Sequence, residues 1–534
     1  MQTLLVGLDA ACFPVLRPLF EDGALPHLES LFDDGATGRL ESQIPPWTAS
    51  AWPSLYTGTN PGKHGVFDFL RFDGYDWDIV NATDVRQRTL WEYADAAGLT
   101  SVVVNAPVTS PPPDIDGAVV PGYLAAEDPD CHPDGILDDV REAVGDYRVY
   151  ARRETDETAG DDRFEDYLEL ARMRGAAFRY LADRFGPEFG FVQFQKTDAV
   201  FHDYPGDHGK VRRIYRAVDE QIGAILDECD PDTVVVASDH GMGEYDGYEF
   251  RVNEFLREAG VVETTTGGQG VPSWFQIKDE RLTGGAEQGA SGHPVLERLA
   301  ATAATVGLTY QRGKAVLERL GLAEFVGRHV PVGAVFAASD AVDFSASRAY
   351  LRSPSELGVR LNVEGRDPDG VVARDEYDRV REEVISLLSS ATTPTGTPVF
   401  EEVVPREKYI DGPYAQEAVD VLAVPTDFQH GLSALVGEQF GEPEPWNHKR
   451  HGVIALAGEG VDSGADLSGA HLFDVASTVL ATLDVAPAAV MDGDPLAAVD
   501  APDERSYPDY EAAAQAATED ADVAERLSDL GYLE

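Results

Sequence analysis

Acidic and imidazole side chains follow three separate hydrophobic runs of this chain. Asp9 ends the run TLLVGLD, Asp198 and His202 follow FGFVQFQ, and Asp239 and His240 follow TVVVAS. Short β-branched and aliphatic runs are typical of buried strands, and ligands of open α/β sheets bind beyond the carboxyl ends of the strands. We therefore expect these side chains to converge on one place. Carboxylates and imidazoles at that density favour a divalent metal site, and so a metal enzyme.

A threonine in the segment PPWTASAWPSLYTGTNPGKHG, residues 45–65, could act as a nucleophile. Pro-Pro breaks the chain, Thr48 is suited to an N-cap, and a short helix is predicted over 49–56. A hydroxyl at a helix N-terminus lies among free N–H groups that can hold a phosphate. Metal coordination would lower the pKa of that hydroxyl enough for attack. Taken alone, the segment favours a Thr48 that only caps a helix, by about two to one.

Strand-like and helix-like segments alternate through the first half of the chain. Strands are expected at 3–8, 101–105, 189–195 and 233–237, and helices at 14–22, 25–34, 89–97, 165–184 and 210–229. The Pro- and Asp-rich stretch 107–164 predicts loops that flank the active site. This alternation indicates a parallel sheet with helices on both faces.

The pattern changes after residue 243. A short helix is predicted at 252–260, a Gly-rich stretch covers 264–292, and 294–328 has helical periodicity. Residues 263–345 are therefore interpreted as an inserted cap that shapes substrate specificity. Strands are expected again at 349–352, 358–362, 419–424 and 452–457, followed by an acidic tail over 501–534 with a short helix at 523–533.

The composition is strongly acidic. The 95 acidic and 42 basic residues give a net charge of -53 at pH 7. Such a surface repels nucleic acid and anionic lipid, so neither a nucleic-acid duplex nor a membrane is expected as a partner. The acidic residues are spread along the whole chain, as in soluble proteins of salt-loving hosts. We expect a halophilic, cytoplasmic protein.

The cysteines and the hydropathy add little chemistry. Cys12, Cys131 and Cys229 form no CxxC pair, so neither a disulfide framework nor a thiolate metal site is indicated. The first residues run directly into a strand, and no stretch has the length of a transmembrane helix. Oligomeric state is left open.

Five motifs occur in one order: GLDA at 7–10, the segment 45–65, KTDAVFH at 196–202, SDHGM at 238–242 and HKRHG at 448–452. Together they resemble the alkaline phosphatase superfamily, in its type I phosphodiesterase and nucleotide pyrophosphatase branch. LNVEGRDPDGVV at 361–372 also resembles a stretch of prokaryotic members. The resemblance implies a three-layer α/β/α sandwich with a mainly parallel central sheet, with 1–262 and 346–500 as the catalytic core.

The resemblance also implies two neighbouring divalent ions, most simply zinc, with manganese as the alternative. The implied ligands fall into two groups, with Asp9, Asp239, His240 and the Thr48 oxygen on one ion and Asp198, His202 and His448 on the other. His448 is preferred to His451 because of its spacing to Gly452, and His64 is expected in a turn or behind the ligands. Two such ions roughly 3.5–4 Å apart would stabilise the attacking and leaving oxygens of phosphoryl displacement.

The reaction implied is hydrolysis of a small-molecule phosphate ester through a phosphothreonine on Thr48. Backbone N–H groups after Thr48, and Lys196, are the predicted donors to the phosphoryl oxygens. Nucleotide pyrophosphatases carry Asn and Lys where this chain has Ala51 and Trp47. Either other groups bind the phosphoryl oxygens here, or the substrate is not a nucleotide.

Diesters are favoured over monoesters. A phosphomutase-type transferase and a non-catalytic metal-binding relative are the alternatives. A sulfatase is disfavoured because the segment around Thr48 lacks the C-x-P-x-R-like pattern.

Overall fold

A seven-stranded sheet forms the centre of the larger lobe in this computed structural model, which describes residues 1–152, 161–266 and 340–516. The strand order is β2–β20–β8–β1–β7–β5–β6. The strands of this sheet are β1 (Thr3–Leu8), β2 (Ala36–Glu41), β5 (Ser101–Val104), β6 (Gly117–Val120), β7 (Phe189–Phe194), β8 (Thr233–Ala237) and β20 (His451–Gly458). Five neighbouring strands, from β8 to β6, run parallel, while β20 is antiparallel to both β8 and β2.

The three strands that precede the acidic motifs lie next to one another. β1 pairs with β7 through Leu8 and Phe194, and with β8 through Gly7 and Ala237. Every residue of β1, β7 and β8 is buried, which explains their unbroken apolar runs. Their carboxyl ends therefore deliver the following residues to one edge of the sheet.

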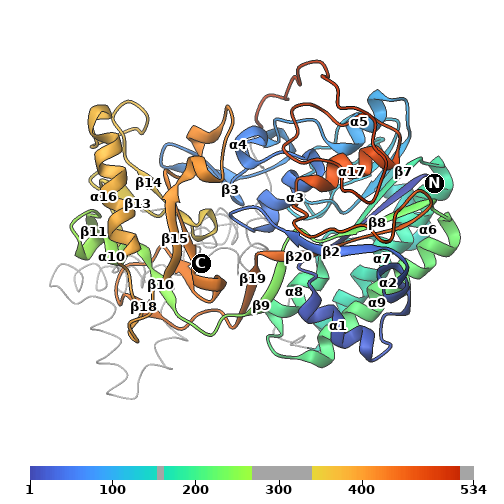
Figure 1. The fold of residues 1–534 in the computed structure, drawn as a ribbon, viewed down its shortest axis with the longest axis horizontal. Helices are drawn as coiled ribbons and strands as arrows, with labels where there is room; N and C mark the ends of the chain where they lie inside the picture. The colour runs from blue at the N-terminus through green and yellow to red at the C-terminus, as the bar shows by residue number, and fades with distance from the viewer. Residues whose placement is uncertain (153–160, 267–339, 517–534) are drawn as a thin grey trace, which may run out of the picture.

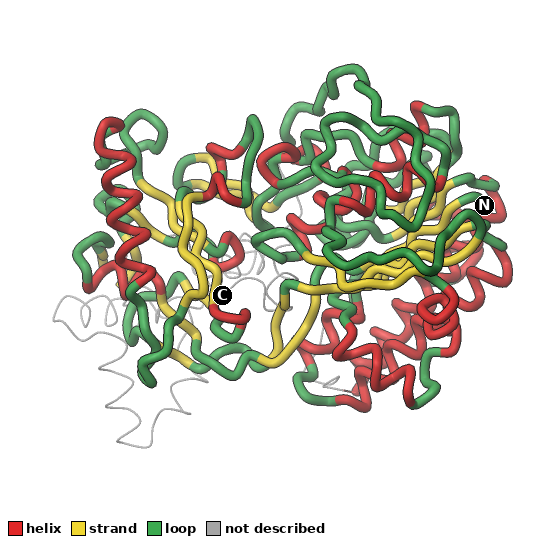
Figure 2. Tube along the Cα trace, viewed as in Figure 1, coloured by secondary structure: helices red, strands yellow, loops and turns green. Residues whose placement is uncertain are grey.

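Helices cover both faces of this sheet (Figures 1 and 2). One face carries α1 (Phe13–Glu21), α2 (Pro26–Asp34), α6 (Ile136–Val144), α7 (Asp161–Phe185), α8 (Lys196–Asp203) and α9 (His208–Cys229). The other carries α3 (Thr48–Thr57), α4 (Pro61–His64), α5 (Leu90–Ala96) and α17 (Asp474–Thr482). The predicted three-layer sandwich with a mainly parallel sheet is confirmed.

A smaller lobe lies beside the sandwich, at the left of Figure 1. It contains a four-stranded antiparallel sheet, β13 (Ala349–Tyr350), β14 (Gly358–Leu361), β16 (Val421–Pro425) and β15 (Phe400–Pro405), in the order β13–β14–β16–β15. A second sheet has the order β17–β10–β18, from β10 (Glu249–Arg251), β17 (Gly431–Ser433) and β18 (Phe440–Gly441). Its helices are α10 (Val252–Glu258) and α16 (Tyr377–Ser389).

Three two-stranded pairs complete the described structure. They are β3 (Leu70–Asp73) with β4 (Asp76–Ile79), β9 (Gly241–Glu244) with β19 (Trp446–Lys449), and β11 (Thr264–Thr266) with β12 (Asp340–Val342). The pair of β9 and β19 spans the junction between the two lobes in Figure 1.

Several segments have a different structure, or lie in a different sheet, from what the sequence predicted. Residues 107–164, predicted as loops, contain β6 and α6. Of the strands expected after residue 346, only that at 452–457 joins the central sheet, as part of β20; those at 349–362 and 419–424 build the smaller lobe. The division into core and cap stays a prediction, because residues 267–339 and 517–534 lie outside the described residues, as do the expected helices at 294–328 and 523–533. No helix of the described part is long and apolar enough to cross a membrane.

Candidate metal centre and nucleophile

Thr48 is the first residue of α3, one position later than the N-cap that its sequence context predicts. Trp47 occupies the N-cap position, and no side chain caps the helix. The N–H groups of Ser50 and Ala51 both donate to the Trp47 carbonyl, at 3.0 and 2.8 Å. The buried Thr48 hydroxyl instead lies 3.2 Å from Nε2 of His240. The hydroxyl is therefore directed into the cluster of expected ligands and has no capping role.

The first ligand group surrounds His240. Its Nε2 lies 3.1 Å from Oδ2 of Asp239 and 3.6 Å from Oδ1 of Asp9, and all three side chains are buried. The other oxygen of Asp9 accepts hydrogen bonds from Trp52 Nε1, at 3.3 Å, and Gln193 Nε2, at 2.8 Å. These two donors fix the orientation of the Asp9 carboxylate.

The second ligand group is a triangle of three atoms. Oδ1 of Asp198, Nε2 of His202 and Nε2 of His448 are each 3.4 Å from the other two. Asp198 and His202 are four residues apart on α8, so one helical face presents both. His202 Nδ1 is 2.7 Å from Oε1 of Glu444, and His448 Nδ1 is 3.1 Å from the Pro46 carbonyl.

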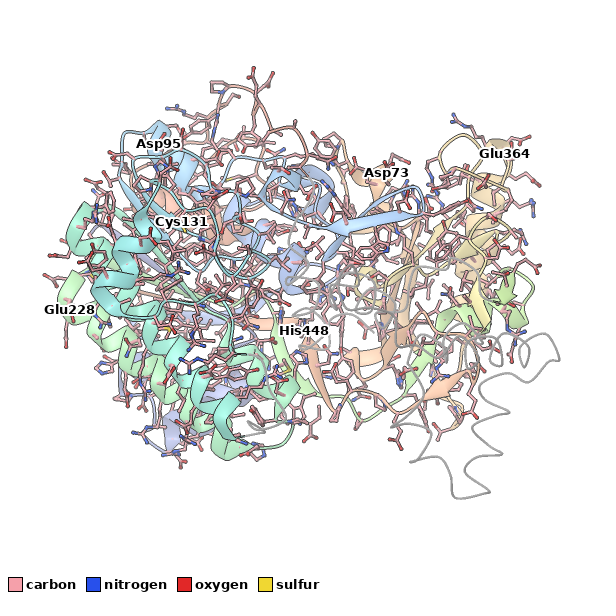
Figure 3. All side chains as sticks on the ribbon, turned by 180° about the vertical axis from the view of Figure 1, so that it is seen from behind. Asp73, Asp95, Cys131, Glu228, Glu364 and His448 are labelled. Carbon is pink, nitrogen blue, oxygen red and sulfur yellow. The ribbon has the colours of Figure 1, made fainter. Side chains whose placement is uncertain are left out.

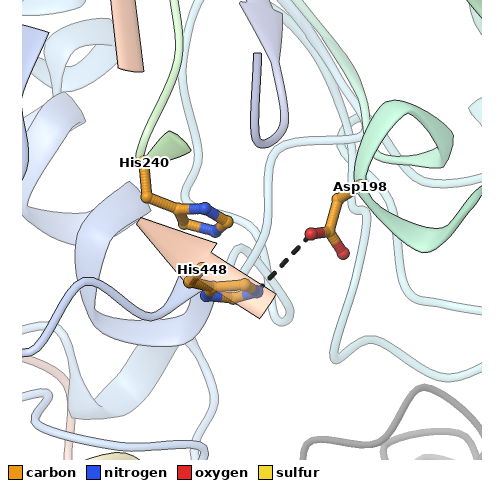
Figure 4. A group of neighbouring side chains, drawn as sticks. All are labelled: Asp198, His240 and His448. Carbon is orange, nitrogen blue, oxygen red and sulfur yellow. Dashed lines mark ion pairs between the residues drawn. The ribbon is translucent and has the colours of Figure 1, made fainter. Parts of the chain in front are cut away.

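The late His448 reaches the site on the two-stranded ribbon of β9 and β19. Met242 pairs with His448, and Gly241 with Lys449, directly after the Asp239–His240 motif. The rings of His240 and His448 consequently stack, as Figure 4 shows beside Asp198. Ligand atoms of Asp9, Asp239 and His240 lie within 4.8 Å of one another, as do those of Asp198, His240 and His448. His240 thus borders both groups, and Figure 3 places His448 between the two lobes.

Two buried carboxylates with little compensation, those of Asp9 and Asp239, make this cluster suitable for cations. Burial, and then repulsion by Asp239 and Asp198, raises the pKa of Asp9 well above its usual range. Oδ1 of Asp9 and Oδ2 of Asp239 are buried and accept no hydrogen bond from any described residue. A bound cation would provide the missing partner and remove the repulsion. The residues present therefore fit a divalent metal centre.

The second group is electrostatically different. Although burial opposes both effects, the charge interaction with His202 holds the pKa of Asp198 well below its usual range, while Asp198 and Glu444 raise the pKa of His202. Burial, followed by the neighbouring His240, lowers the pKa of His448 to about 3. His448 is therefore a neutral imidazole, the form in which histidine binds metals.

The sequence of the chain matches a known family model over more than half of its length. The model described as type I phosphodiesterase / nucleotide pyrophosphatase matches residues 3–321. The chain belongs to this family. Members of this family are phosphodiesterases and pyrophosphatases, which makes the protein a phosphate-ester hydrolase. No curated protein matches the chain.

Solved structures share the fold of this phosphodiesterase-family enzyme. Phosphonoacetate hydrolase from Sinorhizobium meliloti 1021, in complex with phosphonoformate, is 15% identical, with a TM-score of 0.50, covering 91% of this chain and 96% of its own. Wild-type alkaline phosphatase PafA is 14% identical, with a TM-score of 0.51, covering 93% of this chain and 98% of its own. The fold is therefore that of alkaline phosphatase-like enzymes, as the motifs predicted.

Lys196 lies at the start of α8 but makes no described contact with Thr48. Its ammonium donates to Oε1 of Gln195 at 2.7 Å and lies 4.8 Å from the centre of the Tyr167 ring. Burial lowers its pKa to about 7. Its role as a donor to the phosphoryl group stays a prediction.

A buried polar network supports α3 from behind. The hydroxyl of Ser54 lies 2.8 Å from Nε2 of His64 and donates to Gln43, whose amide nitrogen reaches Ser50 at 2.5 Å. Burial lowers the pKa of His64 to about 3. His64 is therefore a neutral imidazole that supports α3 through Ser54.

Four groups that contact the expected ligands were not predicted from the sequence: Trp52, Gln193, Glu444 and the carbonyl of Pro46. Gln193 is a polar residue in the otherwise apolar strand β7, and that contrast is a signal that could have identified it. Glu444 lies between β18 and β19, among several acidic residues with no periodicity. Only the fold shows which of these carboxylates contacts a ligand.

Proposed function

We propose that this phosphate-ester hydrolase acts on diesters in preference to monoesters, with Thr48 as nucleophile and two divalent ions. The observation that carries the proposal is the position of the Thr48 hydroxyl. It lies at the start of a buried helix, 3.2 Å from His240 Nε2, beside two groups of carboxylate and imidazole ligands.

The two groups suggest how the ions would be held. Asp9, Asp239 and His240, with the Thr48 oxygen, would bind one, and Asp198, His202 and His448 the other, with zinc preferred for such mixed ligands. When bound, the ions would lower the pKa of the nucleophile and stabilise charge on the attacking and leaving oxygens.

The residues of the chain carry out the displacement. Oγ1 of Thr48 forms a bond to phosphorus as the bond from phosphorus to the ester oxygen breaks, which gives phosphothreonine and the free alcohol. Water then cleaves the phosphothreonine and restores the hydroxyl. The N–H groups of Thr48 and Ala49 precede the first intrahelical donors and can stabilise charge on the phosphoryl oxygens.

Space for the departing alcohol lies at the junction of the lobes. A pocket there is bordered by Trp47, His202 and Tyr245 from the larger lobe and by residues of the smaller lobe that include Leu357 and His430. It opens next to His202, one of the proposed ligands. A diester needs such a site, because its phosphorus carries a second organic group.

Hydrolysis of bis(p-nitrophenyl) phosphate and p-nitrophenyl phosphate tests the proposal. We expect faster release from the diester, loss of release with a chelator, and loss in Thr48→Ala with unchanged circular dichroism. Thr57→Ala is the matched control, because it removes a buried hydroxyl at the other end of α3 that bonds only within the helix region. Equal activity of Thr48→Ala and wild type would refute the nucleophile, and release of p-nitrophenol from neither ester would refute the hydrolase itself.

A further inference from the structure

A small cavity lined by buried residues lies next to the candidate metal centre, at the carboxyl ends of β5 and β7. Its volume is ≈ 20 Å³, and its polar lining comes from Asn105, Tyr123, Tyr150, Arg174, Gln195 and Lys196. Every residue that lines it is buried. A cavity of this size holds one water molecule or one ion of similar radius.

Two cationic side chains line this cavity with only neutral hydrogen-bond partners. The Lys196 ammonium donates to the side-chain oxygen of Gln195. The Arg174 guanidinium donates to the carbonyls of Arg148 and Val149, at 2.5 and 2.6 Å. Within the described part of the chain, neither cation has a carboxylate at salt-bridge distance. Lys196 is 8% exposed and Arg174 only 3%.

Buried charges of one sign call for a counter-charge. An isolated ammonium or guanidinium pays a large desolvation penalty, so buried cations are normally paired with an anion. Aromatic rings offset part of this cost, since Lys196 lies 4.8 Å from the Tyr167 centroid and Arg174 lies 4.7 Å from that of Tyr147. Such rings carry no full negative charge. Asp203 acts on Lys196 and Glu127 on Arg174 from beyond salt-bridge distance, and no carboxylate of the described residues lines the cavity itself.

An amide donor adds to the same lining. Because Oε1 of Gln195 accepts from Lys196, its Nε2 is left as a donor. That nitrogen is buried and has no hydrogen-bond acceptor among the described residues. Gln195 itself is 6% exposed. An ammonium, a guanidinium and an amide therefore line one small cavity with hydrogen-bond donors, which is the chemistry of an anion site.

We propose that this cavity binds a single small monovalent anion, a halide, between Lys196, Arg174 and Gln195. Phosphate and sulfate are excluded by size, because a tetrahedral oxyanion is larger than the cavity. The anion would neutralise Lys196, at the start of the α8 helix that carries Asp198 and His202, and Arg174 of α7. This site is separate from the phosphoryl-transfer site and does not depend on the function proposed for it.

Crystals of the full chain soaked in sodium bromide test the site directly. We expect an anomalous peak at the bromine edge inside the cavity of the wild type, and its loss in Lys196→Met. Lys408→Met, which removes an exposed lysine paired with Glu402, should retain the peak. Gln195→Glu offers a second test, because a carboxylate beside Lys196 should displace the bromide.

Thermal unfolding tests the proposed halide site in solution. At equal ionic strength, the wild type should have a higher Tm in sodium chloride or bromide than in sodium gluconate, with a saturable dependence on halide. Lys196→Met and Gln195→Glu should lose this difference, while Lys408→Met keeps it. A wild-type cavity without an anomalous peak, or a wild-type Tm equal in both salts, would overturn the proposal in favour of trapped water. A lysine that contacts phosphate in a substrate-analogue complex while the cavity stays free of bromide would do the same.

Discussion

The imidazole rings of His240 and His448 lie nearly parallel, with centroids 3.7 Å apart and an angle of 19° between their planes. His448 lies on β19 and His240 directly precedes β9, the opposite strand of the same ribbon, although their residue numbers differ by 208. Each ring turns its Nδ1 to a main-chain carbonyl, Gly241 for His240 and Pro46 for His448. Both Nε2 atoms therefore face carboxylates, Asp239 for His240 and Asp198 for His448, and the two stacked rings lie between the two proposed ion sites.

Replacement of His448 should remove one of the two proposed divalent ions. His448→Ala takes away one corner of the triangle with Asp198 and His202, so we expect about one divalent ion per chain by elemental analysis. Diester hydrolysis should fall by more than the ~10–100-fold typical of losing an outer partner of a ligand. The control is His451→Ala, an exposed histidine three residues away. A His448→Ala protein that still binds two ions would contradict the assignment.

Glu444 should set the metal affinity through His202. Its Oε1 is 2.7 Å from Nδ1 of His202, and Asn447 donates to its other oxygen, at 2.7 Å. Glu444→Gln should weaken binding of the ion held by His202 by ~10–100-fold, measured by competition with a chromophoric chelator. Glu442→Gln, an exposed neighbour, is the matched control. Equal affinities of the two variants would show that Glu444 does not position the ring.

The stability of the fold should depend on pH through the protonation of His64. Burial lowers the pKa of His64 to about 3 in the folded chain, while the unfolded chain binds this proton near pH 6.5. Below pH 6.5 the unfolded state therefore binds more protons, and the contribution of His64 to stability falls as pH falls.

Chemical unfolding of wild type and His64→Gln at two pH values measures this effect. Between pH 6 and pH 4.5, wild type should lose about 2 kcal/mol more than His64→Gln. His208→Gln, which removes an exposed histidine, should behave as wild type. A constant difference between wild type and His64→Gln at all pH values would refute the prediction.

The indole of Trp47 should contribute to catalysis. Its Nε1 is buried and has no acceptor among the described residues, and its ring packs on His448 with centroids 4.5 Å apart. Because Trp47 directly precedes Thr48 and borders the junction pocket, the N–H is placed to donate to a bound ester.

Trp47→Phe keeps the ring contact and removes the donor. We expect a decrease in kcat/KM of at least ~10-fold, about the loss of one hydrogen bond in a transition state, with both ions retained. Trp446→Phe, which alters a ring stacked on Phe201, should leave kcat/KM near wild type. An unchanged value in Trp47→Phe would exclude the indole as a donor.

The bounds of strands were predicted most accurately where both faces of the strand are buried. The strands expected at 3–8 and 233–237 have the same bounds as β1 and β8, because a parallel strand covered on both faces is a continuous apolar run. Thr48 was predicted one position too early, at the N-cap, because caps are assigned from residue type and Trp47 is an unusual one. The sequence also predicted that Asp9, Asp198 and Asp239 lie close together, because each of them follows a buried strand of this recognisable kind.

The smaller lobe and the outer contacts could not be predicted in the same way. β13, β14 and β16 are as apolar as strands of the central sheet, so their sequences do not say which sheet they join. The contact between Glu444 and His202 joins positions 242 residues apart and follows only from the ribbon of β9 and β19. Long-range pairing of this kind is not encoded in local periodicity.

The position of β20 has a consequence for the order in which the molecule is completed. β20, residues 451–458, lies between β2 and β8, so the N-terminal β2 meets the rest of the sheet only through a strand translated more than 400 residues later. Until then the β8 edge has no covering strand, and an uncovered edge readily pairs with other chains. The same late segment carries His448, so a nascent polypeptide acquires the last of its proposed metal ligands and covers the β8 edge in one event.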